Sequence, residues 1–133
     1  MIDEIYVVSH VNYSGEVHGL TADGQVASTL LCFMVKSMVS KYKDIVAIYP
    51  MDKLTVAKQY DCYCDVMVLL RGIDMNVVAV SVDNAATNRK FFTDYLCNGT
   101  LSTSITDAVT NQPVFLLFDP VHCIKNVYNN FHS

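Results

Sequence analysis

The fold is decided by residues 77–92, VVAVSVDNAATNRKFF. The run from Val77 to Val82 is apolar on both faces, which is typical of a strand buried in the middle of a sheet. It stops at Asp83, and residues 88–90 then favour the first turns of a helix that runs back over the sheet. A carboxylate at the end of a buried strand lies at the rim of the sheet, where ligands and metals bind. The alternative is that Asp83 caps the following helix, and this stretch alone leaves both open.

The composition is that of a folded, acidic domain. The chain has 133 residues, 52% of them hydrophobic, which is ample for the core of one domain. Its net charge of -4 argues against binding nucleic acid through bulk positive charge. If DNA is the substrate, most of the contacts to it must come from elsewhere. The longest apolar block, 26–35, is too short to span a bilayer, and the sequence does not open like a signal peptide. We therefore expect an intracellular protein with reduced cysteines and no membrane partner.

The other elements follow from apolar periodicity and turn residues. Gly72 is a plausible stop for the first helix, and Asp119 with Pro120 is a favourable start for the last. Strands are predicted at 3–9, 17–20, 30–35, 45–49 and 113–118, and helices at 54–70 and 121–131, in addition to the elements of 77–92.

This order of elements predicts an α/β fold with a ribonuclease H-like mixed sheet. Antiparallel leading strands come first, and parallel βα units follow. In such a sheet the first strand can lie beside the strand that ends at Asp83, about 4.8 Å away. Carboxylates at that separation can hold one cation between them with the short oxygen distances that suit Mg²⁺. Asp3 and Asp83 are therefore candidate metal ligands and catalytic residues.

Weaker signals come from the last strand and from basic side chains. Asp119 and His122 are possible auxiliary metal ligands, although Asp119 as a helix cap with His122 in the first turn is the simpler interpretation. Arg89, Lys90 and Lys125 are candidate DNA contacts that could approach a phosphate backbone near the metal. A solvated helix face is the default explanation for these three basic residues.

Four motifs stand in order along nearly the whole chain: IDEI at 2–5, CFMV at 32–35 followed by KYK at 41–43, VDNAATNRKFF at 82–92, and FDPVHCIKN at 118–126 with NNF at 129–131. Together they resemble the P-element transposase family and its THAP-domain relatives. The resemblance implies the amino-terminal part of the ribonuclease H-like catalytic domain of a cut-and-paste DNA transposase.

The resemblance also implies a site and partners. In that family an Asp on the first strand, an Asp on the fourth and a distant Glu hold divalent metal, and Asp3 and Asp83 match the first two positions. It implies two Mg²⁺ or Mn²⁺ ions, transposon-end DNA as partner, a possible homo-oligomer of the full-length protein and a nuclear location. The family's guanine nucleotide has no recognisable site in this chain, which shows no glycine-rich phosphate loop.

The chain also departs from the family pattern. Its glutamates stand only at positions 4 and 16, so nothing after Asp83 matches the third ligand. We therefore interpret residues 1–133 as an incomplete domain, either a fragment or a decayed copy, that is inactive alone. One alternative is a domesticated, non-catalytic DNA- or protein-binding module with the same fold. Another is a small-ligand domain of flavodoxin or receiver type, which antiparallel leading strands would exclude.

Overall fold

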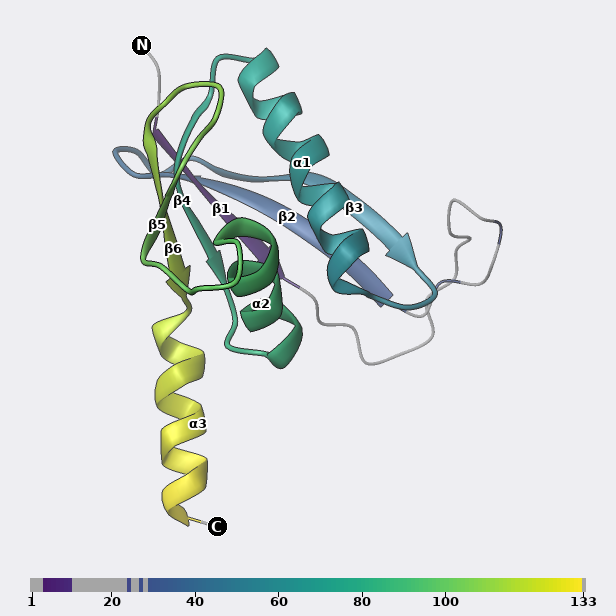
Figure 1. The fold of residues 1–133 in the computed structure, drawn as a ribbon, viewed down its shortest axis with the longest axis vertical. Helices are drawn as coiled ribbons and strands as arrows, with labels where there is room; N and C mark the ends of the chain where they lie inside the picture. The colour runs from purple at the N-terminus through teal and green to yellow at the C-terminus, as the bar shows by residue number, and fades with distance from the viewer. Residues whose placement is uncertain (1–3, 11–23, 25–26, 28, 133) are drawn as a thin grey trace.

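The computed structural model describes residues 4–10, 24, 27 and 29–132, which form a mixed sheet with helices on one of its faces (Figure 1). The strands are β1 (Glu4–His10), β2 (Thr29–Ser37), β3 (Lys43–Met51), β4 (Asn76–Val82), β5 (Ser104–Thr106) and β6 (Pro113–Phe118). The helices are α1 (Val56–Gly72), α2 (Ala86–Lys90), its π-helical continuation η1 (Phe91–Leu96), and α3 (Pro120–His132).

Within the described residues the sheet has six strands in the order β3-β2-β1-β4-β6-β5. The leading strands β1, β2 and β3 pair antiparallel, whereas β4 pairs parallel with β1 and β6. The short strand β5 then returns antiparallel to β6. This arrangement confirms the predicted ribonuclease H-like mixed sheet, and its antiparallel leading strands exclude the flavodoxin or receiver type.

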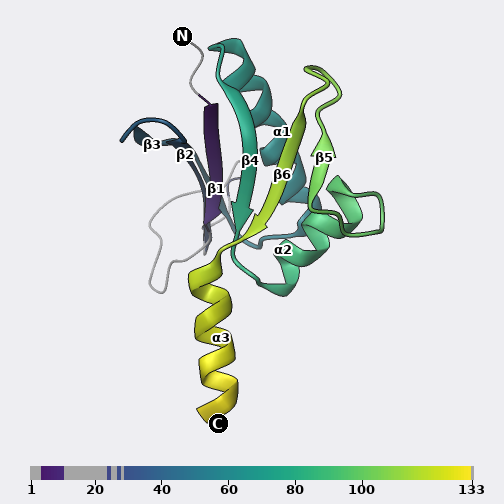
Figure 2. The same cartoon turned by 90° about the vertical axis from the view of Figure 1, so that its left-hand side faces the viewer.

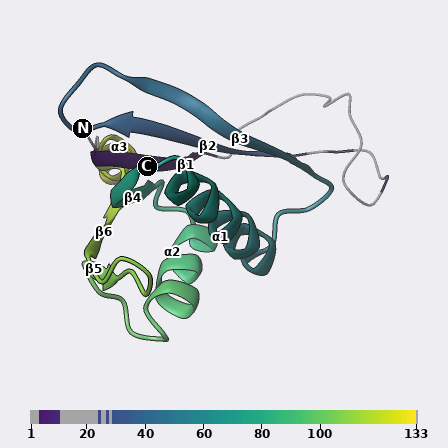
Figure 3. The same ribbon diagram turned by 90° about the horizontal axis from the view of Figure 1, so that it is seen from above.

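The apolar core lies between the sheet and the layer formed by α1, α2 and η1, which lie on the same side of the sheet in the view from above (Figure 3). The central strand β4 has the burial that its Val-rich sequence predicts, since Val80 and Val82 are both inaccessible to solvent. Phe91 and Phe92 are fully buried although they are consecutive, and the backbone N–H of Cys97 donates to the carbonyl of Phe92 in a π-type turn. The two phenylalanines thus pack the segment of α2 and η1, which follows the Asp83 turn, against the sheet.

Helix α1 has defined signals at both ends. The hydroxyl of Thr55 accepts a hydrogen bond from the N–H of Lys58 at 3.2 Å and so caps the first turn. At the other end Asp74 adopts a left-handed φ of 56°. The N–H of Met75 donates to Leu70 O at 2.9 Å, and that of Asp74 donates to Arg71 O at 3.0 Å. This is a Schellman motif with Asp74 in the left-handed position, and the helix ends at Gly72, the predicted stop.

Three parts of the sheet differ from the sequence prediction or were not tested. The predicted strand at 17–20 lies outside the described residues. Strand β5 was not predicted, because 101–112 is polar and has no clear period. Strand β6 was expected to be buried, but only alternate side chains face the core, and Phe115 and Leu117 are exposed on the other face.

Helix α3 projects away from the end of the sheet in both side views (Figures 1 and 2). Its apolar side chains are exposed, Phe131 at 84% most of all. No helix in the described part of the chain combines the length and the apolarity needed to cross a membrane.

Candidate metal centre

Two carboxylates stand at the carboxyl ends of the neighbouring parallel strands β4 and β6. Val82 is paired with Phe118, so the next residues, Asp83 and Asp119, follow side by side at one edge of the sheet. The N–H of Asp119 donates to the carbonyl of Val82 at 2.8 Å, which continues the pairing past the ends of the strands. Both residues are partly buried. The position is the one at which α/β sheets place ligand-binding groups.

The side chain of Asp83 is held in one orientation from the protein side. Its Oδ1 accepts hydrogen bonds from the N–H of Ala85 at 2.9 Å and from Nδ2 of Asn88 at 2.7 Å. Its Oδ2 makes no hydrogen bond with any described residue. Helix α2 has Ala85 as its N-cap, without a side-chain capping bond, so Asp83 is not the N-cap of that helix. One oxygen is thus anchored, and the other is left for an external partner.

A second buried amide stands behind Asn88. Gln59, at the end of the first turn of α1, is inaccessible to solvent, and its Nε2 donates to Oδ1 of Asn88 at 2.6 Å. Asn88 itself is 7% exposed. A hydrogen-bonded chain therefore runs from α1 through α2 to Asp83.

Asp119 has a different role from Asp83. Its Oδ1 accepts from the N–H of Val121 at 2.9 Å, and its carbonyl accepts from the N–H of Cys123 at 3.1 Å, so Asp119 caps α3. His122 belongs to the first turn of α3, but its side chain lies outside the described part. Their auxiliary metal role stays a prediction.

Strand β1 lies beside β4, as expected, and the register of this pair decides which residues of β1 come near Asp83. Asp3 lies outside the described residues. Its neighbour Glu4 pairs with Asn76 at the amino end of β4, and the parallel pairing runs on to Val8 and Ser81. From Asn76 to Asp83 the chain extends by about 20 Å at the usual rise of a strand. A direct pair of Asp3 and Asp83 stays a prediction.

The basic candidates lie on exposed helix faces. Nη1 of Arg89 donates to the backbone carbonyl and to Oδ1 of Asn84, both at 3.2 Å, and so braces the turn that follows Asp83. Lys90 on α2 and Lys125 on α3 are exposed. The structure places Arg89 and Lys90 on the helix that follows the Asp83 turn, and their contact with DNA stays a prediction.

The family described as "TNP-like, RNase H N-terminal domain" matches residues 1–96. The chain belongs to this TNP-like RNase H family. The expected resemblance to the P-element transposases is thereby confirmed. A search of curated proteins found no match.

A solved transposase complex shows the same fold as this TNP-like RNase H domain. The "Drosophila P element transposase strand transfer complex" superposes with a TM-score of 0.75 at 17% sequence identity. The match covers 94% of this chain and 28% of that one, so the chain spans less than a third of the transposase. The HTLV-2 integrase catalytic core domain in complex with magnesium, in its dimeric form, matches with a TM-score of 0.41 at 10% identity, over 76% of this chain and 60% of that one.

The donor set of this TNP-like RNase H domain fits a divalent cation in part. The open Oδ2 of Asp83 is the type of ligand that Mg²⁺ and Mn²⁺ prefer. Among the described residues, however, no group of three or more His, Cys, Asp or Glu side chains could hold a metal ion. The described residues therefore supply only part of a metal site, and Asp3 as a second ligand stays a prediction.

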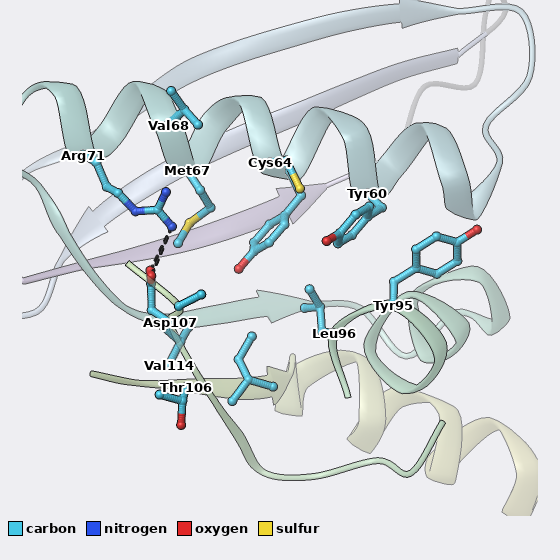
Figure 4. Close-up of a pocket in the computed structure, with 13 residues that line it drawn as sticks. Tyr60, Cys64, Met67, Val68, Arg71, Tyr95, Leu96, Thr106, Asp107 and Val114 are labelled. Carbon is cyan, nitrogen blue, oxygen red and sulfur yellow. Dashed lines mark hydrogen bonds and ion pairs between the residues drawn. The ribbon is translucent and has the colours of Figure 1, made fainter. Parts of the chain in front are cut away.

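Sequence reasoning missed a cavity of about 260 Å³ between α1 and the β5–β6 edge of the domain (Figure 4). Three tyrosines line it, and Figure 4 shows Arg71 reaching across to Asp107. Nη2 of Arg71 lies 3.2 and 3.1 Å from the two carboxylate oxygens of Asp107. Asp107 also accepts from the N–H groups of Val109 and Thr110, so it organises the loop before β6. The ion pair of Arg71 with Asp107 joins residues far apart in sequence, and no local sequence pattern indicates it.

Proposed function

We propose that this chain is part of the metal-dependent catalytic core of a P-element-like DNA transposase, which acts in DNA strand cleavage and transfer. The observation that carries the proposal is Asp83, held by two hydrogen bonds at the end of the central strand with its Oδ2 open. Membership of the TNP-like RNase H family supports the same assignment. The proposal includes transposon-end DNA as partner, a nuclear location and a homo-oligomer of the full-length protein.

The chemistry divides between the cation and the chain. Bound Mg²⁺ or Mn²⁺ would activate a water or 3′-hydroxyl and stabilise the leaving oxygen of a phosphodiester. Asp83 and Asp3 would hold the metal, and Asp119 and His122 would be auxiliary. Arg89, Lys90 and Lys125 would approach the phosphate backbone. Glutamates stand only at positions 4 and 16, so the family's third ligand is absent, and we propose that the chain alone does not cut DNA.

Cation binding is testable on this chain by nuclear magnetic resonance. Mn²⁺ broadens the resonances of nuclei close to it, so even weak binding is visible at low occupancy. We expect Mn²⁺ to broaden the amide signals around Asp83 most strongly. Asp83→Asn should abolish this broadening because it removes the charged ligand, and Asp3→Asn should weaken it.

The matched control is Asp94→Asn, which makes the same change on an exposed residue of η1. It should leave the broadening around Asp83 unchanged. Equal broadening in wild type and Asp83→Asn would show that Asp83 is not a ligand. An unchanged pattern in Asp3→Asn would remove only Asp3 from the site.

The second candidate is a non-catalytic DNA- or protein-binding module with the same fold. The net charge of -4 favours it, because bulk positive charge is what binds phosphate backbones. Anisotropy of a labelled DNA duplex, measured over a range of salt concentrations, distinguishes the two functions. Tight DNA binding that is unaffected by Asp83→Asn, together with no Mn²⁺ broadening, would support the module and contradict the catalytic assignment.

A further inference from the structure

The hydrogen-bonded chain behind Asp83 links two elements that are distant in sequence. Gln59 on α1 and Asn88 on α2 are 29 residues apart, and their amides meet at 2.6 Å. Asn88 then donates to Asp83 at 2.7 Å. Neither amide reaches bulk solvent to a significant extent, because Gln59 is fully buried and Asn88 nearly so.

The direction of these bonds is fixed by the chemistry of the amide groups. A side-chain amide has one oxygen that accepts and one nitrogen that donates. Because Nε2 of Gln59 occupies the oxygen of Asn88, the nitrogen of Asn88 is turned towards the carboxylate. A carboxylate accepts hydrogen bonds only, so the opposite orientation of Asn88 would set its oxygen against Oδ1 of Asp83. Gln59 thus supplies a donor to the one orientation of Asn88 that can hydrogen-bond to Asp83.

We propose that Gln59 and Asn88 are positioning residues that anchor Oδ1 of Asp83 and leave Oδ2 directed to a divalent cation. The proposal rests on the proposed function, since it concerns the same site. Groups that hydrogen-bond to a metal ligand orient it and tune its affinity for the metal. Here the support comes from the protein core, through α1, and not from the exposed turn alone.

A purely structural role for the two amides is disfavoured by one observation. Oε1 of Gln59 is buried and has no hydrogen-bond partner in the described part. An unpartnered buried polar atom costs stability, and an apolar side chain of similar volume avoids that cost. Methionine at position 59 would therefore favour stability more than glutamine does. Glutamine, however, supplies a hydrogen-bond donor to Asn88.

Two variants test the proposal, with two measurements on each. Asn88→Ala removes the donor to Asp83, and Gln59→Met keeps the volume at position 59 but removes the group that orients Asn88. The first measurement is the Hα–Hβ coupling constants of Asp83 without metal, which report whether its χ1 angle has one value or averages over several. The second is Mn²⁺ affinity from the broadening titration.

The expected result is one χ1 conformer of Asp83 in the wild type and averaged couplings in both variants. Mn²⁺ affinity should fall by about tenfold in Asn88→Ala, the usual effect of losing a supporting hydrogen bond, and by less in Gln59→Met. Gln59→Met should unfold at the same urea concentration as the wild type or a higher one. Gln112→Met is the matched control, because Gln112 is exposed before β6, at the other end of that strand from Asp119.

Single-conformer couplings for Asp83 in both variants, or wild-type Mn²⁺ affinity in both, would overturn the proposal. Should Asn88→Ala fail to fold, Gln59→Met decides alone. Failure of the proposed function has a different signature, namely no Mn²⁺ broadening in the wild type. In that case the coupling constants still show whether the two amides fix Asp83.

Discussion

Asp83 and Asp119 both follow a parallel strand, yet their hydrogen bonds give them different roles. Asp119 caps α3 through the N–H of Val121, whereas α2 has Ala85 as its N-cap and takes no side-chain cap. Asp83 instead accepts a hydrogen bond from the side-chain amide of Asn88. The sequence offered capping as an alternative for both residues. The structure confirms capping for Asp119 and shows that Asp83 is not the N-cap of α2, and the role of Asp83 as a metal ligand stays a prediction.

At the same scale, Asp107 gives a prediction about stability and pH. Burial raises the pKa of Asp107, but hydrogen bonds from Val109, Arg71 and Thr110 outweigh it and hold the pKa below its usual value. A carboxylate with a lowered folded-state pKa stabilises the protein above its unfolded pKa of about 4. That contribution is lost as the pH falls through the folded-state pKa. We therefore expect Asp107→Asn to lower the free energy of unfolding by about 2 kcal/mol at pH 7.

Urea unfolding of wild type and Asp107→Asn at pH 7 and near pH 2 checks this. The difference in free energy between the two proteins should shrink as the pH falls, because protonation removes the charge of Asp107 in the wild type as well. A constant difference across this range would mean that the charge of Asp107, and its pair with Arg71, contributes nothing.

At the scale of the element, the end of α1 is decided by backbone geometry. Asp74 occupies the left-handed position of the Schellman motif, where glycine is preferred because it has no Cβ. Its negative charge also lies at the negative end of the helix dipole. We expect Asp74→Gly to raise the free energy of unfolding by about 1 kcal/mol, measured by urea denaturation.

Asp74→Ala separates the two causes, because it removes the charge but keeps the Cβ. It should stabilise less than Asp74→Gly or should destabilise the protein. Equal stabilisation by both substitutions would assign the effect to the charge and not to the left-handed backbone.

At the scale of the whole molecule, the described residues cover the sheet on one face only. The layer of α1, α2 and η1 buries one set of side chains, and the other face leaves Phe115 and Leu117 exposed. Helix α3 projects from the end of the sheet and covers neither face in the side views (Figure 2). The stability lost when a side chain is truncated should therefore depend on the face of the sheet that it occupies, and not on its hydrophobicity alone.

Adjacent leucines of β6 test this directly. Leu116 is 7% exposed and Leu117 is 44% exposed, on opposite faces of the same strand. Leu116→Ala should cost about 3 kcal/mol because it opens a cavity in the core. Leu117→Ala should cost about 0.5 kcal/mol, as expected of a surface substitution. Urea denaturation of the two variants gives both values, and similar losses would mean that the second face is covered in solution.

Much of the fold was predictable because it depends on local signals. Apolar periodicity located β4, α1 and α3, and the position of Asp83 after a Val-rich run placed it at the rim of the sheet. Local signals failed where the pattern was weak. The polar segment that contains β5 has no period, and β6 is apolar throughout although only alternate residues face the core.

The sequence by itself thus determined the mixed sheet, the order of its elements and the carboxylate at the end of its central strand. Only the tertiary structure decided the register of β1 against β4, the exposure of one sheet face and the amide chain that holds Asp83. The physical reason is the distance along the sequence between the residues that make each contact. Strands and caps arise from neighbouring residues, whereas strand register and the meeting of Gln59 with Asn88 arise from contacts between distant segments, which leave no periodic trace in the sequence.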